Sequence, residues 1–107
     1  MENSALPCTA ASREDSEWIE QPVPTEVILA RKIYWGVLID AYLFNAARVG
    51  KSFAAMVFYD HSGVILDGTT VATPPLAFLR ANGPFKLMRS IGSNDHYVIA
   101  SEHQTSV

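Results

Sequence analysis

The dipeptide Asp-His occurs twice in this chain, at Asp60-His61 and Asp95-His96, and the third histidine is His103. Carboxylate and imidazole groups bind zinc, iron or manganese, and together they can carry out acid–base catalysis. The spacing argues against a metal site, because neighbouring residues of a strand point to opposite faces of a sheet and no His-x-His or His-x3-His spacing is present. In "DHSG", residues 60–63, Asp and Gly instead take their preferred positions in a type I turn. We interpret both dipeptides as turns, with a metal-dependent hydrolase at these four residues and His103 as an alternative.

Other catalytic signatures are missing from the sequence. No Gly-x-Ser-x-Gly, glycine-rich phosphate loop or Gly-x-Gly-x-x-Gly occurs. The single cysteine, Cys8, excludes an internal disulfide and a cysteine-based zinc site. We therefore predict a protein that is not an enzyme and has no metal and no cofactor.

A short stretch resembles the RNA-recognition-motif family. "KSFAAMVF", residues 51–58, is similar to that family's first signature strand, and "IYWGVL", residues 33–38, is similar to the second. The positions that match the first signature are Lys51, Phe53, Ala54 and Phe58. The resemblance implies that Tyr34 and Phe53 stack on bases, so a single-stranded nucleic-acid-binding module is a second alternative function. The chain departs from the family pattern at Ala55, where a central aromatic residue is expected, and in the turn-rich sequence that follows Tyr59.

The composition favours contact with another macromolecule. Hydrophobic residues make up 49% of only 107 residues, and a chain of this size cannot bury them all. We predict a non-enzymatic interaction protein, accessory or inhibitory, of the kind found among small bacterial and phage factors, and a homodimer. The partner-binding residues that we predict are Trp18, Ile19, Tyr34, Trp35 and Tyr42. A basic patch is predicted from Arg31, Lys32, Arg80, Lys86 and Arg89, which could instead protect strand edges.

Charge is distributed unevenly along the chain. Residues 1–26 hold six acidic side chains and one basic side chain, a net charge of −5, whereas the whole chain has a net charge of −3. We predict a flexible acidic leader at 1–24, with a short helix at 12–20 that Ser12 can cap. Such a leader either keeps the protein in solution, or it lies on the basic face of the rest of the chain and competes with an acidic partner.

The sequence also predicts where in the cell the protein is found. The start, "MENSALPCTA", does not have the pattern of a signal peptide. The most apolar stretch, residues 33–44, contains Asp40 and is shorter than the roughly 20 residues needed to span a bilayer. We predict a cytoplasmic protein without membrane contact.

Residues 25–107 are predicted to form one compact, β-rich domain. β-branched and aromatic residues predict a strand over 26–35. Residues 37–49 fit either a helix or a strand, and we favour a strand to Leu43 followed by a turn that ends at Gly50. Further strands are predicted at 52–60, 64–73 with a break near 67–68, 76–80, 84–91 and 96–102. The predicted fold is mainly β or α+β: an antiparallel meander or partly closed barrel of five to seven short strands, with at most one or two short helices.

Overall fold

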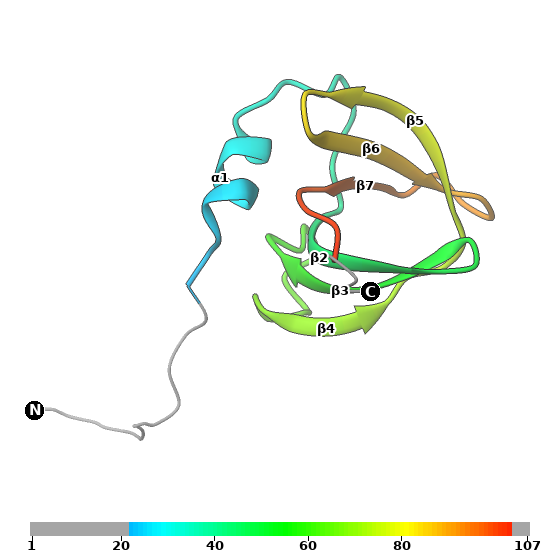
Figure 1. The fold of residues 1–107 in the computed structure, drawn as a ribbon, viewed down its shortest axis with the longest axis horizontal. Helices are drawn as coiled ribbons and strands as arrows, with labels where there is room; N and C mark the ends of the chain where they lie inside the picture. Colours follow the sequence, from blue (N-terminus) through cyan, green and yellow to red (C-terminus); the bar gives the residue numbers. More distant parts are fainter. Residues whose placement is uncertain (1–21, 104–107) are drawn as a thin grey trace, which may run out of the picture.

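The computed structural model describes residues 22–103, which form a six-stranded sheet and one short helix (Figure 1). The elements are α1 (Thr25–Arg31), β2 (Ala41–Val49), β3 (Ser52–Phe58), β4 (Thr69–Ala72), β5 (Leu76–Asn82), β6 (Phe85–Ser90) and β7 (His96–Ile99). The predicted mainly β fold, with short strands and a short helix, is confirmed for this part of the chain. The helix predicted at 12–20 lies outside the described residues.

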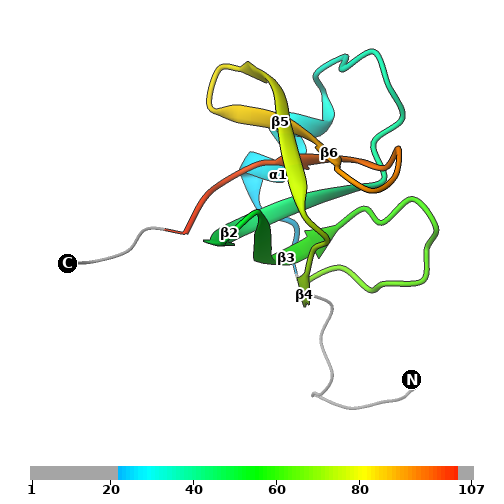
Figure 2. The same cartoon turned by 90° about the vertical axis from the view of Figure 1, so that its right-hand side faces the viewer.

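The strands follow the order β4-β3-β2-β7-β6-β5. Neighbouring strands are antiparallel except β2 and β7, which are parallel, so the sheet is mixed and not a pure meander. It is strongly curled but not closed into a barrel (Figure 2). The segment between the two edge strands β4 and β5 crosses beside β3, where Thr73 N donates to Phe53 O (2.8 Å) and Leu76 N donates to Lys51 O (2.8 Å).

The strand predicted over 26–35 is wrong, because residues 25–31 form α1. Val27 and Ala30, three residues apart, are both fully buried on one side of this helix. Pro24 precedes the first turn, and its carbonyl accepts hydrogen bonds from Val27 N (3.1 Å) and Ile28 N (3.2 Å). Strand propensity mostly reflects packing in a sheet, and this segment packs a helical face against the core instead.

Strand β2 differs from the prediction at both ends. It begins at Ala41 and continues to Val49, whereas the sequence predicts a turn after Leu43. Strand β7 pairs with residues 41–43, and pairing with β3 extends β2 through an irregularity between Phe44 and Ala47. Asn45 takes a positive φ of 57° at this point. The strand predicted at 64–66 is also wrong, since these residues belong to a loop between β3 and β4.

Both faces of the central strands are buried, because successive side chains of a strand point to opposite faces. One core cluster lies under α1 and consists of Val27, Ala30, Trp35, Tyr42, Phe58, Phe85, Leu87, Val98 and Ala100. The other lies on the opposite face and consists of Ala41, Leu43, Ala46, Phe53, Ala55, Val57, Leu76, Met88 and Ile99. Within residues 22–103 no helix has the length and hydropathy to cross a membrane.

Candidate interaction surface

The three aromatic residues of the 25–107 domain that we predict to bind a partner have different environments. Tyr34 is 91% exposed, whereas Trp35 is 3% exposed and Tyr42 is 7% exposed. Burial raises the pKa of the Tyr42 hydroxyl, and the nearby Arg31 opposes this shift. Tyr34 is therefore the aromatic residue of this set that can touch a partner directly, and the other two form the surface beneath it. The predicted residues Trp18 and Ile19 lie outside the described residues.

Loop 32–40, between α1 and β2, is anchored by Trp35. The indole Nε1 of Trp35 donates to the carbonyl of Ala30 (3.1 Å), which joins the loop to α1. The carbonyl of Trp35 accepts a hydrogen bond from the Arg80 guanidinium on β5. The backbone then bends at Gly36, beside Arg80, with a φ of +83°, a conformation that favours glycine. These contacts bury Trp35 and turn Tyr34 outward.

Loop 59–68, between β3 and β4, is shaped by Asp60, which forms the predicted turn. Gly63 N donates to Asp60 O (2.9 Å). The Asp60 carboxylate accepts from Ser62 Oγ (2.6 Å) and from the amides of Ile65 (3.0 Å) and Val64 (3.1 Å). The Ser62 hydroxyl, followed by the Ile65 amide, lowers the pKa of Asp60. The carboxylate is thus used to hold the loop, as the turn interpretation requires.

Asp40 joins the two loops and was not among the predicted site residues. Its carbonyl accepts from His61 N (2.7 Å), and its carboxylate accepts from His96 N (2.8 Å). Asp40 N in turn donates to His96 O (2.8 Å). Both Asp-His dipeptides therefore meet at Asp40 through their backbones, and among residues 22–103 no three His, Cys, Asp or Glu side chains could hold a metal ion. An acidic residue inside the apolar stretch 33–44 was the sequence signal for this role.

We expect Asp40→Ala to lower the free energy of unfolding by about 1–3 kcal/mol, the usual cost of leaving a buried donor unpaired. The donor here is the half-buried backbone amide of His96. Asp40→Asn keeps an acceptor at the same place, so it should retain most of the stability. Urea unfolding of the two variants measures the difference. Equal losses in both would show that the bond to His96 does not carry this contribution.

A cleft of about 500 Å³ lies between loop 32–40 and the start of loop 59–68. We call it the Tyr34 cleft; its lining includes Arg31, Tyr34, Val37, Leu38, Tyr59 and His61. The two loops, which lie on the same side of the sheet (Figure 2), carry a set of exposed apolar side chains. We call this set the two-loop surface: Tyr34, Val37, Leu38, Val64, Ile65 and Leu66. Of these, Leu38 is 60% exposed, Val64 80% and Leu66 78%.

The predicted basic residues fall into two groups. The Arg31 guanidinium lies 4.1 Å from the centre of the Tyr59 ring, Lys32 is exposed at the end of α1, and Arg80 binds Trp35 O. Arg31 and Arg80 border loop 32–40, and Lys32 is the first residue of this loop. Lys86 instead forms an ion pair with Glu102, and Arg89 is exposed on β6 opposite His96.

The two aromatic residues implied by the resemblance to RNA-recognition motifs lie in different environments. Phe53 is 3% exposed, and the Arg48 guanidinium covers its ring at 4.9 Å. Tyr34 is open to solvent. Stacking on bases needs accessible ring faces, and only Tyr34 of this pair offers one.

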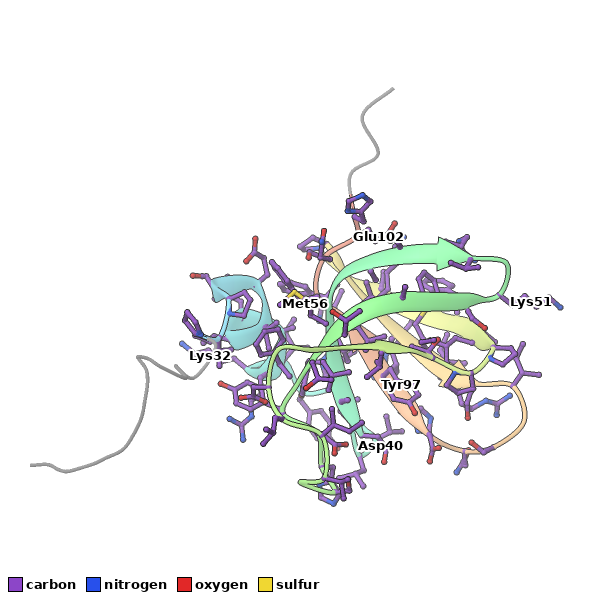
Figure 3. All side chains as sticks on the ribbon, turned by 90° about the horizontal axis from the view of Figure 1, so that it is seen from below. Lys32, Asp40, Lys51, Met56, Tyr97 and Glu102 are labelled. Carbon is purple, nitrogen blue, oxygen red and sulfur yellow. The ribbon has the colours of Figure 1, made fainter. Side chains whose placement is uncertain are left out.

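A second cleft, of about 390 Å³, lies on the other side of Asp60. Asp40 and Tyr97, both labelled in Figure 3, belong to its lining together with Asp60 and Asp95. Burial raises the pKa of the Tyr97 hydroxyl, and the carboxylates of Asp95, Asp40 and Asp60 raise it further. At neutral pH this hydroxyl stays protonated, so it can donate a hydrogen bond but cannot act as a base.

Comparison with protein-family models, with curated proteins and with solved structures found no match for this chain. The fold and the two-loop surface are therefore the observations from which function can be argued.

Proposed function

We propose that this protein is a non-enzymatic accessory or inhibitory protein that binds a partner protein through the two-loop surface. The observation that carries the proposal is the exposure of six large apolar side chains on two loops that Asp40 holds together. Scattered apolar residues are ordinary on a protein surface, but a concentration of them is typical of interaction sites. Because both loops are hydrogen-bonded to each other and to the sheet, little ordering entropy is lost when a partner binds.

The surroundings of the loops favour a protein over the alternative partners. Phe53 lies in the core, so a nucleic acid would find one exposed aromatic ring of the implied pair. The carboxylate of Asp60 is occupied by the amides and hydroxyl of its own loop. An exposed tyrosine next to exposed leucines is instead typical of protein interfaces, where tyrosine is enriched.

Self-association and a cytoplasmic location belong to the same proposal. Strand β5 lies at an edge of the sheet and exposes Phe78 (57%) and Leu79 (44%). An apolar edge strand can pair with another chain, which supports a second copy as one partner. A single cysteine suits a reducing compartment.

The proposal is tested by differential capture from the native host. The bait pair is the wild-type protein and the variant Tyr34→Ser/Leu38→Ser/Leu66→Ser, with Val49→Ser as the matched control. Val49 is 65% exposed at the end of β2, so its replacement removes exposed apolar surface outside the two loops. We expect a protein that wild type and control retain and the triple variant loses, with all baits showing the same melting temperature. Identical protein sets from all three baits would refute the two-loop surface as the binding site.

A further inference from the structure

The Tyr34 cleft has both apolar and basic side chains in its lining. Val37, Leu38 and the ring of Tyr34 are among the apolar side chains of the lining. Arg31 belongs to the same lining, and Lys32 follows it at the end of α1. Arg80 reaches the loop from β5. The charge and shape of this cleft suit an acidic segment that carries a large apolar side chain.

The lining also contains one acidic residue, Asp60, but the cleft still favours an acidic segment. Its carboxylate accepts hydrogen bonds from Ser62, Val64 and Ile65 within its own loop. Arg31, in the same lining, and Lys32, which follows it at the end of α1, together outnumber this one carboxylate.

A segment with the complementary composition precedes α1 in the same chain. Residues 12–20, "SREDSEWIE", contain four acidic side chains and one basic side chain, and they include Trp18 next to Ile19. The acidic side chains Glu17 and Glu20 stand on either side of this apolar pair. This is the combination of charge and apolar bulk that the Tyr34 cleft would accept.

The chain is long enough for the segment to reach the cleft. Val23 is half-buried against the core cluster under α1. The seven residues of α1 span roughly 10 Å at 1.5 Å per residue. The five residue steps from Val23 back to Trp18 cover up to about 17 Å when extended. Trp18 can therefore reach the C-terminal end of α1, where Arg31 and Lys32 stand.

We propose that residues 12–20 dock in the Tyr34 cleft of their own chain, with Trp18 inside the cleft and the carboxylates of Glu17 and Glu20 beside Arg31 and Lys32. The leader thereby covers part of the two-loop surface in the free protein. A partner that uses the cleft must displace it, and the segment of that partner would itself be acidic and aromatic. This last consequence rests on the proposed function; the docking itself does not.

The test uses the full-length protein alone, so its result is independent of any partner. Backbone amide NMR spectra are compared between wild type and Trp18→Ala. We expect shift changes at 31–39 and 59–61, far from residue 18 in the sequence. Changes confined to the residues next to position 18 would overturn the proposal. Changes in the cleft that disappear on dilution would show docking into a second copy and would overturn docking within one chain.

Reversing the charge of a lysine near the cleft, and of a lysine far from it, tests where the leader docks. Lys32→Glu should lower the ratio of docked to free leader about two- to five-fold, the effect of an exposed ion pair, and move the cleft amides towards their positions in Trp18→Ala. Lys51→Glu makes the same charge change at the opposite end of the view in Figure 3, and it should leave these amides in place. Adding Glu20→Lys to Lys32→Glu should restore the wild-type spectrum. Equal effects of the two lysine variants would overturn the assignment of the cleft.

Discussion

Replacing Trp35 with alanine should lower the free energy of unfolding by about 3–5 kcal/mol, the usual cost of truncating a buried aromatic residue to alanine. Trp35 is 3% exposed and belongs to the core cluster under α1. The substitution also removes the hydrogen bond from the indole to the Ala30 carbonyl. Since small domains are stable by about 5–15 kcal/mol, the variant loses a large share of its stability. Urea unfolding followed by circular dichroism measures the loss.

Two further substitutions separate the contributions of the Trp35 ring, its hydrogen bond and the neighbouring residue. Trp35→Phe keeps most of the buried ring but loses the bond to Ala30, so it should cost about 1 kcal/mol for the bond in addition to a small packing term. Tyr34→Ala, one residue away but 91% exposed, should change the stability by less than about 0.5 kcal/mol. Equal destabilisation by Trp35→Ala and Tyr34→Ala would contradict the description of loop 32–40 as anchored by Trp35.

The sequence predicted the elements whose patterns are local. Residues 53–58 are all apolar, which predicts a buried strand, and the structure has β3 there, with Phe53, Ala55 and Val57 on one face. The turn at Asp60 follows from the aspartate and the glycine three residues later. Together, short apolar segments separated by such turns were sufficient to predict a mainly β domain.

Features that depend on long-range packing could not be predicted. The propensities within α1 are mixed, because Val27 and Ile28 favour a strand whereas Leu29 and Ala30 favour a helix. The burial of Val27 and Ala30 against the sheet decides for the helix. The parallel pairing of β2 with β7 joins Ala41 to Tyr97, which are far apart in the sequence. Which of Tyr34 and Trp35 is buried depends on the turn at Gly36 and on Arg80 from β5. Periodicity alone could not assign these contacts.

Replacing Tyr34 with alanine should weaken the binding of the partner protein about 30-fold or more, since a true hot spot contributes at least about 2 kcal/mol. The ring is 91% exposed in the described part of the chain, residues 22–103, so a partner that displaces the leader can bury most of its area. Its backbone is fixed by the hydrogen bonds of the next residue, Trp35, to Ala30 and Arg80. Apart from displacing the leader, binding therefore has to order only one side chain, and rigid aromatic anchors are effective for this reason. Titration calorimetry with the partner found by differential capture measures the change.

Val49→Ala is the control for this measurement, because Val49 is exposed but lies outside both loops. It should leave the affinity within about two-fold, as expected for a residue outside the binding site. Leu38→Ala should show an intermediate loss, since Leu38 lines the same cleft but is 60% exposed. Most of the change should appear in the dissociation rate, because substitutions within one interface alter the association rate little. An unchanged affinity for Tyr34→Ala, with the fold intact, would mean that the partner does not use the two-loop surface, however apolar that surface is.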